Sequence, residues 1–405
     1  MSEKKFHPFF ILARTGLILA WAMGLVMPHS KVQSASMLYV NGVSGNDTNL
    51  CTYSHPCATI TRAVAVAASG DTISISSHVY EENLVIQKNL ELVGQSAKNT
   101  IVDGQLAGPT ISIMGSPGNE PQVYLNTLTV TNGMVGVRVE DAQVNLEEVI
   151  VSSNESDYGG EGGGIKCLSG SVTTVNTTVT NNQANFGAGV IVNSDCVLSM
   201  ANSTIYLNQG IHGAGLYVNG SASLTNVTIS LNQATQVPQL PHAGGIFVNA
   251  GGSATLNHCT IAKNQSLTSN DGWQIWAGGT VYLKNTIVQG GSQPDQPNCK
   301  SGTNIVSLGY NLSSDATCNL VGSGDLPDAD AQLYALAANG GSTYTHGLPS
   351  TSPVVDAASP PDPDTPTYDQ RGMAHCDGDF DGIVQGDIGA FEYQPLKIWL
   401  PYTAR

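Results

Sequence analysis

Charged residues are scarce in this chain of 405 residues. They make up 11% of it, and the 15 Lys and Arg are outnumbered by 31 Asp and Glu, so the net charge is −16. A chain with so little positive charge is not expected to bind nucleic acid or anionic lipid. The low content of charge of either sign also argues against a disordered chain, which needs high charge to stay unfolded.

Long hydrophobic runs are lacking too, except for one near the N-terminus. Lys4 and Lys5 precede an uncharged, largely apolar run at 15–27, and small residues follow around Ala35. This order predicts a signal peptide at residues 1–35. The run is short for a bilayer span, so an uncleaved anchor is the weaker alternative, and no second span follows it. We therefore expect an exported protein, extracellular or at the cell surface, with no membrane span in the mature chain.

Glycine is abundant, with 45 residues, and it marks the turns of an internal repeat between Val130 and Ile287. Each unit contains Thr, then Ile or Val, then two further residues and Asn. By subtraction, the asparagines are 28, 26, 24 and 32 residues apart. Such variable spacing is poorly tolerated in helical repeats but suits a parallel β-helix, in which extra residues loop out between rungs. The repeated asparagines are Asn154, Asn182, Asn208, Asn232 and Asn264.

The repeat units have the composition of strands. Residues 223–231 and 281–288 are rich in β-branched residues, alternate apolar with polar, and are bounded by Gly or Asn. We therefore predict an all-β solenoid. Because its rungs stack about 4.8 Å apart, the repeated asparagines are expected to hydrogen-bond to one another as an internal ladder. We prefer this structural role to a role in ligand binding.

The solenoid needs a cap at each end, because an open rung exposes its apolar interior and its unpaired backbone edge. Residues 36–70 predict the N-terminal cap, with a helix within 59–68 that Thr59 begins. Rungs are expected to follow from 71 to 290, so that the β-helix with its cap covers 36–290. A rise in Pro, Gly and Asp after Gly290 marks the next boundary.

Export allows the eight cysteines to form disulfides. Cys167 and Cys196 lie on successive rungs, but two and six positions past the equivalent apolar residues, and this offset argues against a direct bond between them. The pairing of Cys167, Cys196, Cys259 and Cys376 is left open. Two bridges are predicted between cysteines that are close in the sequence, Cys51–Cys57 and Cys299–Cys318.

The N-terminal part of the chain resembles a known class of proteins. Residues 56–64, 70–75 and 80–86 are similar to the opening of secreted right-handed β-helix proteins of the pectin-lyase-like class. The resemblance implies a right-handed, single-stranded parallel β-helix.

The C-terminal part, residues 291–394, contains five separated motifs. They are Gly309-Tyr-Asn-Leu312, Ala338-Asn-Gly-Gly-Ser-Thr343, Ser352-Pro-Val-Val-Asp356, Asp369-Gln-Arg-Gly372 and Asp387-Ile-Gly-Ala-Phe-Glu392. In these motifs the chain resembles the choice-of-anchor Q domain of bacterial surface and secreted proteins, and the resemblance implies a C-terminal cap domain. Where the family tends to have a second Arg, this chain has Met373-Ala-His375. The tail at 395–405 is either a short sorting signal or a last strand that packs on the cap.

Histidines occupy equivalent places in two neighbouring repeats. His212 and His242 stand four positions before the apolar residue that follows the glycine turn, and Asp271 holds that place in the next repeat. In register, these side chains form one exposed column about 5 Å apart. Two imidazoles and a carboxylate suit a transition metal or acid–base chemistry. The alternative is a decorated stack of turns without a ligand.

An acidic segment near the C-terminus has the opening of a calcium loop. Asp377, Asp379 and Asp381 stand at its positions one, three and five, and Gly382 follows for the tight turn. Asp387 lies one place before the position of the last ligand. We predict a structural calcium ion held by these four aspartates. The competing interpretation is a solvated acidic turn.

Catalytic residues are not predicted. The aspartates between 110 and 290 do not share a rung position, and the motifs of β-helix hydrolases are absent. Lyases of this class need clustered acids and a base, and hydrolases need two nearby carboxylates. We therefore expect a monomeric adhesive, structural or glycan-contacting module whose partner is a polysaccharide or a cell-envelope glycan. The alternative is a divergent polysaccharide lyase or glycoside hydrolase.

Overall fold

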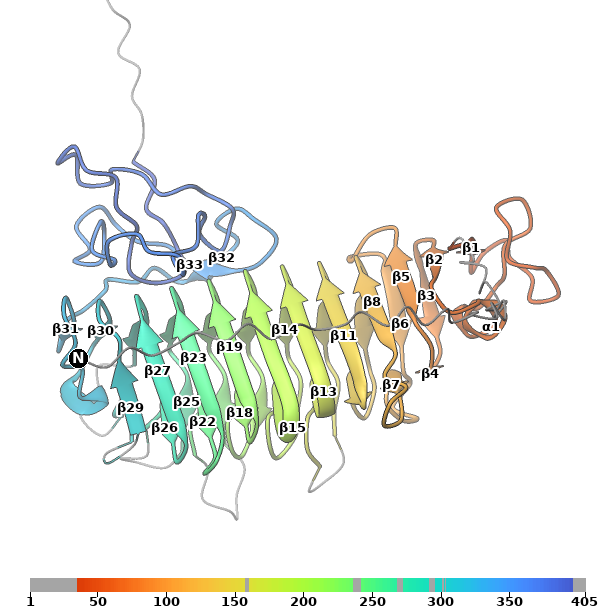
Figure 1. Cartoon of the computed structure of the whole chain (residues 1–405), viewed down its shortest axis with the longest axis horizontal. Coiled ribbons are helices and arrows are strands. Elements are labelled where there is room, and N and C mark those ends of the chain that lie inside the picture. The colour runs from red at the N-terminus through yellow and green to blue at the C-terminus, as the bar shows by residue number, and fades with distance from the viewer. Residues whose placement is uncertain are drawn as a thin grey trace, which may run out of the picture. The chain divides into compact units, whose positions relative to one another are not determined.

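The repeats stack as rungs of a parallel β-helix, as Figure 1 shows. The computed structural model describes residues 35–156, 160–235, 242–267, 272–290, 296–300, 302 and 304–395. The predicted signal peptide therefore lies almost wholly outside the described residues, and so does most of the tail. Residues from Ala35 onward form one unit.

A rung has three faces, which we number in the order in which the chain meets them after the repeated asparagine. Face 1 contains β4 (Leu84–Ile86), β7 (Ile111–Met114), β10 (Val137–Glu140), β18 (Leu216–Val218), β22 (Ile246–Val248) and β26 (Ile275–Ala277). Two longer strands, β13 (Ile165–Val175) and β15 (Val190–Ala201), run from face 1 onto face 2.

Face 2 continues along the whole β-helix, which we also call the coil. Its strands are β1 (Met37–Val40), β2 (Asp71–Ile75), β5 (Leu90–Gly94), β8 (Gln122–Asn126), β11 (Ala142–Glu147), the second halves of β13 and β15, β19 (Ser221–Thr225), β23 (Ser253–Asn257), β27 (Thr280–Lys284) and β29 (Asn304–Ser307).

Face 3 forms a separate sheet. Its strands are β3 (His78–Glu81), β6 (Thr100–Asp103), β9 (Thr129–Thr131), β12 (Ile150–Ser152), β14 (Thr178–Thr180), β16 (Thr204–Tyr206), β20 (Thr228–Ser230), β24 (Thr260–Ala262), β28 (Ile287–Gln289), β30 (Leu312–Ser313) and β31 (Leu326–Pro327). Short strands also pair in the turn after face 3, namely β17 (Gln209–Gly210), β21 (Gln233–Ala234) and β25 (Gln265–Ser266).

The prediction of a parallel β-helix is confirmed, and so is the register inferred from the glycine turns. Val190 pairs with Leu216, which pairs with Ile246, which pairs with Ile275. Alternate residues of the strands point inward, as the burial of β2 shows, and together they form one continuous apolar core. The coil also continues past residue 290, because β29 pairs with β27 and β30 pairs with β28.

The N-terminal cap contains a helix, α1 (Ile60–Val66), whose side chains Ile60, Ala63 and Val64 join the core of the coil. Thr59 begins the helix, since its side chain accepts a hydrogen bond from the backbone N–H of Arg62. The helix therefore covers the apolar interior that the first rung would otherwise expose.

The structure contains the two predicted disulfides and a third, Cys167–Cys196. The expectation that this pair is not directly bonded is wrong. β15 carries one extra residue at the corner between faces 1 and 2, where the register of β13 and β15 shifts. Because of this extra residue, the Cα atoms of Cys167 and Cys196 lie 6.0 Å apart, which is close enough for a disulfide. Among the described cysteines, Cys259 and Cys376 are not bonded.

The five repeated asparagines are buried and lie in one column. The side chain of Asn182 donates to Oδ1 of Asn208 over 3.0 Å, and Asn208 donates in the same way to Asn232 over 2.9 Å. The backbone N–H groups donate to the same oxygens, for example from Asn208 to Asn232 over 3.0 Å. Beyond Asn264 the column ends on Gln274, whose Oε1 accepts from the Asn264 side chain over 2.8 Å.

A strained backbone accompanies the ladder. The residue before each repeated asparagine has a positive φ, including Leu207 at 54° and Leu231 at 57°. A residue with a Cβ adopts this conformation at a cost of roughly 1–2 kcal/mol. The hydrogen bonds of the next residue in the ladder offset that cost, so turn and ladder depend on each other.

The later part of the C-terminal region, which contains the hairpin of β32 (Leu336–Ala337) and β33 (Thr345–His346), lies against the outer surface of face 3 (Figure 1). The 3-10 helix η1 (Ala316–Cys318) belongs to the end of the β-helix, where Cys318 joins the apolar core. The hydroxyl of Thr228 donates to Oε1 of buried Gln370 over 2.6 Å, and Nε2 of Gln370 donates to Thr204 over 2.9 Å. The backbone N–H of Ala390 donates to the hydroxyl of Thr260 over 3.0 Å. The small hydroxyl residues of face 3 therefore hold this region in place.

No helix among the residues described above has the length and apolar character needed to cross a bilayer.

The ladder leads to a prediction about stability. Replacing Asn208→Leu leaves Asn182 and Asn232 without buried hydrogen-bond partners, which should lower the free energy of unfolding by about 1–3 kcal/mol. Urea unfolding followed by circular dichroism measures the change. Asn99→Leu is the matched control, since Asn99 is exposed in a turn. Equal effects of the two substitutions would contradict the role of the ladder.

A second prediction concerns the stability of the folded protein at low pH. His346 lies between Ser230 and the carbonyl of Tyr334, and burial lowers its pKa from 6.5 to about 4. Its contribution to stability is complete above pH 6.5 and is lost as the pH falls through 4, because only the unfolded chain takes up the proton between these values. Between pH 7 and pH 4, His346→Gln should lose about 2 kcal/mol less stability than the parent protein.

The measurement is the unfolding free energy at both pH values. Other buried histidines, such as His258 with a pKa lowered to about 3 by burial, act in both proteins and cancel in the comparison. An identical pH dependence of the two proteins would contradict the assignment to His346.

Candidate functional site

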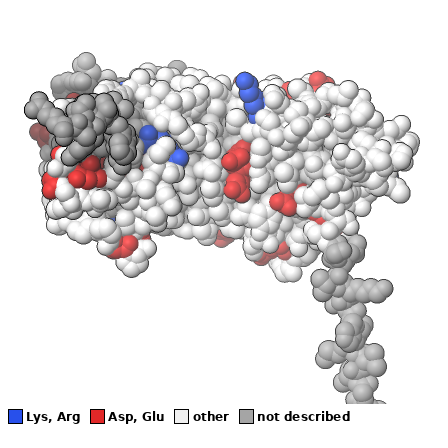
Figure 2. Space-filling view, turned by 90° about the horizontal axis from the view of Figure 1, so that it is seen from above, with Lys and Arg blue, Asp and Glu red and all other residues white. Residues whose placement is uncertain are grey.

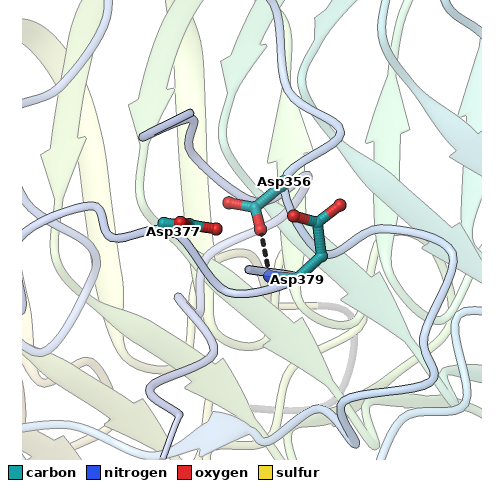
Figure 3. Close-up of side chains that lie close together, drawn as sticks. All are labelled: Asp356, Asp377 and Asp379. Atoms are coloured by element: carbon teal, nitrogen blue, oxygen red, sulfur yellow. Dashed lines mark hydrogen bonds between the residues drawn. The ribbon is translucent and has the colours of Figure 1, made fainter. Parts of the chain in front are cut away.

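Three aspartates converge in the C-terminal region. Asp356, Asp377 and Asp379 each bring a carboxylate oxygen within 4.8 Å of the others, and Figure 3 shows them facing one another. The loop that carries Asp377 folds around Asp356, whose Oδ2 accepts from the backbone N–H groups of Gly378 over 2.7 Å and of Asp379 over 2.6 Å. The arrangement gathers negative charge in a half-buried place.

The oxygen atoms in this cluster suit a cation. Oδ1 of Asp356 and Oδ1 of Asp377 are buried, and neither has a hydrogen-bond partner among the described atoms. Burial also raises the pKa of Asp356 above its ordinary value, against the effect of the two backbone N–H groups. Carboxylate oxygens without donors are costly to bury, and they are the ligands that calcium prefers. The residues present therefore fit a hard divalent cation.

The cluster differs from the predicted set of ligands. Asp381 lies outside it, and its carboxylate accepts from the backbone N–H of Ile383 over 2.7 Å. Asp387 belongs to a second group with Asp356 and Glu392. The spacing of the calcium-loop pattern did not point to Asp356, because that pattern covers only the acidic loop that begins at Asp377. The signal was available, since Asp356 ends one of the motifs of the family resemblance.

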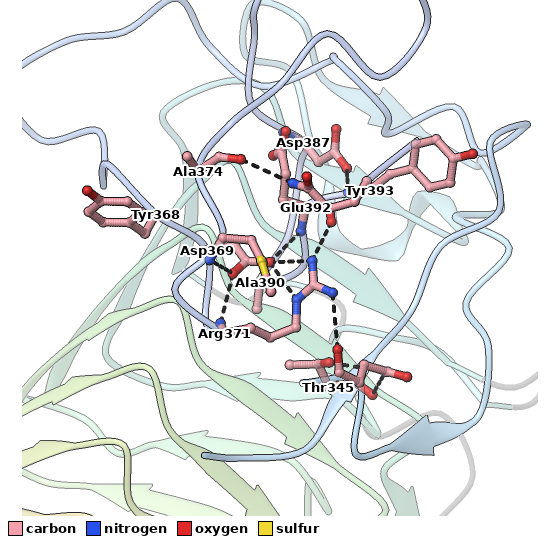
Figure 4. Close-up of polar contacts among 12 residues, drawn as sticks. Thr345, Tyr368, Asp369, Arg371, Ala374, Asp387, Ala390, Glu392 and Tyr393 are labelled. Carbon is pink, nitrogen blue, oxygen red and sulfur yellow. Dashed lines mark hydrogen bonds and ion pairs between the residues drawn. The ribbon is translucent and has the colours of Figure 1, made fainter. Parts of the chain in front are cut away.

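Asp387 holds two backbone segments together and does not join the cluster of Asp356, Asp377 and Asp379 (Figure 4). It is buried, and its two oxygens accept from the backbone N–H groups of Asp356 over 2.8 Å and Tyr393 over 2.5 Å. Burial and the neighbouring Glu392 raise its pKa well above the ordinary value. Asp387 thus joins the segment around 356 to the end of the described chain.

Arg371 joins two segments of the C-terminal region, residues 369–372 and 387–392, as Figure 4 also shows. Its guanidinium pairs with buried Asp369 over 2.7 Å, donates to the carbonyl of Glu392 over 2.5 Å and lies 3.6 Å from the ring centre of Phe391. Arg371 is thus paired with a carboxylate, a carbonyl and a ring face, which compensates for its burial.

His375 lies between two oxygen acceptors of the C-terminal region. Its Nδ1 lies 2.9 Å from the buried carboxylate of Glu392, and its Nε2 lies 2.8 Å from the carbonyl of Pro366. The hydrogen bond to Glu392 raises the pKa of His375. His375 therefore gives the buried carboxylate of Glu392 a hydrogen-bond partner, which becomes an ion pair when the imidazole is protonated.

The histidine column is formed in part. His212 and His242 are paired across adjacent rungs, and their rings stack with centres 5.0 Å apart and planes 22° apart. Asp271 lies outside the described residues. Phe186 continues the stack on the other side of His212. Burial lowers the pKa of His212 to about 4, and His242 acts in the same direction. Stacked neutral rings favour the interpretation that these histidines pack on one another at the turns and do not bind a ligand.

A second aromatic column lies beside the histidines and was missed. The rings of Tyr217 and Phe247 stack with centres 4.9 Å apart, and those of Phe247 and Trp276 with centres 4.1 Å apart. Each of these residues directly follows the apolar residue that sets the register. The sequence signal was therefore an aromatic residue at the next aligned position of three successive repeats. They form a small outer core on face 1 with Ile191.

Face 2 presents a different surface, made of uncharged polar side chains. One outward column crosses seven successive rungs and has an exposed tyrosine near each end. Between the tyrosines stand an amide and four hydroxyl groups, half-buried or exposed. We call this the face 2 column. Its residues are Tyr124, Asn145, Thr173, Ser199, Ser223, Thr255 and Tyr282.

Acidic and basic side chains occur only in scattered places on the side of the molecule shown in Figure 2. Lys284, which stands beside Tyr282 on β27, is paired with Asp362 of the C-terminal region. A hollow of about 160 Å³ at the N-terminal end of the face 2 column is lined by Tyr124 together with Glu91 and Glu147. The sequence pattern did not point to these two glutamates, because they lie on different rungs and two positions apart along the strand.

Comparison with solved structures finds a pectate lyase, Pel9A, with a TM-score of 0.51 over 90% of this chain and 98% of that one, at 13% identity. The chain has a pectin-lyase-like fold. An alginate lyase from Paenibacillus sp. strain FPU-7 matches with a TM-score of 0.38 over 67% of this chain and 99% of its own, at 12% identity. The pectin methylesterase PemA from Erwinia chrysanthemi matches with a TM-score of 0.36 over 65% and 92%, also at 12% identity.

No protein-family model matches the sequence, and no curated protein matches it. At such low identity the pectate lyase establishes the pectin-lyase-like fold alone. The function has to be argued from the surface of this chain.

Proposed function

We propose that this protein is exported and works outside the cell as a module that contacts a neutral glycan through face 2. The observation that carries the proposal is the face 2 column, an exposed row of hydroxyl and amide groups with a tyrosine near each end. Its members repeat with the rung spacing of about 4.8 Å, so they offer the same contact many times along one line. An extended polysaccharide, whose hydroxyl groups also repeat along a line, matches such a surface.

The chemistry of the column supports a neutral partner. Hydroxyl and amide groups donate and accept hydrogen bonds, as sugar hydroxyls do, and tyrosine adds an apolar ring with a polar end. The seven residues of the column carry no charge, and Glu91, the next residue in register before Tyr124, is acidic. Three disulfides support a location outside the reducing cytosol.

The proposal includes the domain layout and the role of the C-terminal region. A signal peptide at 1–35 directs export, and the β-helix with its cap presents face 2. Residues 291–394 form a choice-of-anchor Q-like region, whose first part continues the β-helix and whose later part stiffens it by covering face 3. The tail from 395 is a sorting signal or a last strand. A calcium ion held by Asp356, Asp377 and Asp379 stabilises the C-terminal region.

The test of the function is co-sedimentation of the purified protein with insoluble neutral polysaccharides, with cellulose, chitin and a β-glucan as probes. Changing Ser223→Lys and Thr255→Lys together should lower the affinity by at least about tenfold, since two hydrogen bonds of about 1 kcal/mol each are lost. The matched control is Ser342→Lys with Ser350→Lys, two exposed positions in the C-terminal region. Binding that is absent, or that falls equally in both double variants, would contradict the proposal.

The same assay addresses cleavage, the second candidate function. The hollow that contains Glu91 and Glu147 favours it, because glycoside hydrolysis uses two carboxylates. New reducing ends released from a bound polysaccharide would show that face 2 belongs to an enzyme. Binding without release would support a purely adhesive module.

The calcium ion leads to a separate prediction. Because the ion binds the folded state, 10 mM calcium should raise the free energy of unfolding by about 1–3 kcal/mol, given the affinities typical of extracellular sites. Thermal unfolding with calcium and with a chelator measures this. Asp356→Asn should remove the effect, and Asp364→Asn, at an exposed position, should retain it. An unchanged unfolding midpoint in the parent protein would show that the segment is a solvated acidic turn.

A further inference from the structure

A pocket of about 450 Å³ lies at the N-terminal end of face 2. Its floor is formed by Ser74 of β2 and Val93 of β5, which are paired neighbours and point outward. Tyr39 of β1, the strand before β2, and Tyr53 stand at its wall. The volume is within the range of about 300–1,000 Å³ that is usual for small-molecule sites.

The wall that carries Tyr53 is held rigidly. Tyr53 belongs to the loop closed by the disulfide Cys51–Cys57. That loop is bound to the edge of β1, because the backbone N–H of Tyr39 donates to the carbonyl of Cys51 over 2.8 Å and that of Cys57 donates to Tyr39 over 3.0 Å. The rings of Tyr39 and Tyr53 meet edge to face, with centres 5.2 Å apart. A site fixed in this way loses little entropy when a ligand binds.

The polar groups of the pocket are available for a ligand. Asn41 uses its Oδ1 to accept from the backbone N–H groups of Val43 and Ser44, and Gln95 uses its Oε1 to accept from that of Ser77. Both amides therefore keep N–H donors that have no partner among the described atoms. The same holds for the hydroxyl groups of Tyr39, Tyr53 and Ser74, within the described part of the chain.

We propose that this pocket binds one unit of a neutral sugar, with the ring of Tyr53 against the apolar side of the sugar and the amides and hydroxyls on its hydroxyl groups. The inference rests on the proposed function and names the site where the glycan is recognised. The described lining residues carry no charge, so the carboxylate of an acidic sugar would find no cationic partner there. The pocket therefore selects neutral sugars against uronic acids.

The position of the pocket connects it with the face 2 column. Val93 on its floor pairs with Asn126 on β8, the strand that also carries Tyr124. A glycan chain that has one sugar in the pocket can thus continue along face 2. The pocket would recognise the sugar and the column would add contacts in proportion to chain length.

The test is titration of the purified protein with soluble cello-, manno- and galacto-oligosaccharides and with an oligogalacturonate of the same length. We expect at least one neutral series to bind and the oligogalacturonate to bind at least tenfold more weakly. Tyr53→Ala should weaken neutral binding by tenfold or more, and Tyr53→Phe should retain it within threefold. Tyr53 is 81% exposed, so its removal should leave the melting temperature unchanged.

Tyr368→Ala is the matched control, because Tyr368 is also an exposed tyrosine but lies in the C-terminal region. Tighter binding of the oligogalacturonate, or equal effects of Tyr53→Ala and Tyr368→Ala, would overturn the assignment of the pocket. Polysaccharide binding that depends on Ser223 and Thr255 but not on Tyr53 would overturn the pocket alone. Failure of every polysaccharide and every oligosaccharide to bind would overturn the proposed function as well.

Discussion

The rest of this structure depends on the register between rungs. Parallel pairing places equivalent residues of successive repeats directly above one another. A residue type that recurs at one position of each repeat therefore forms a column that runs through the molecule. Inside the coil, the buried asparagines use this register to satisfy one another and the turn backbone. Outside it, the same register produces the stacked histidines, the aromatic column and the face 2 column. A slip of one residue would send each of these sets to the opposite side of its strand.

The three faces then acquire different roles through what covers them. Face 3 is built from small Thr and Ser residues, which allow the C-terminal region to approach and which bind Gln370 and Ala390. Face 1 carries its own aromatic cluster. Face 2 keeps its polar column exposed, and the pocket beneath Tyr53 lies at the end of that face. Both face 2 and face 3 present Thr and Ser side chains outward, but the hydroxyl groups of face 3 are covered by the C-terminal region.

Much of the fold could be predicted because its signals are local. The ladder positions follow from a short pattern, and the helix begun by Thr59 follows from its capping residue. The pairing Cys51–Cys57 follows from proximity in the sequence. Cys167–Cys196 did not follow, because counting along straight strands ignores the corner at which β15 holds an extra residue. In the acidic cluster, Asp377 and Asp379 were found from their spacing, whereas Asp356 is brought to them only by the folding of a distant segment.

The sequence by itself determined the coil, because a repeat specifies both its strands and their register through short-range patterns of Asn, Gly and β-branched residues. It also determined which chemistry the surface offers, since the chain has so few charged and aromatic residues. Only the tertiary structure decided which polar columns are exposed, which aspartates meet, and that two tyrosines from separate segments stand at one pocket. These outcomes depend on contacts between segments far apart in the chain, and their geometry is set by corners, insertions and covering loops that no local pattern contains.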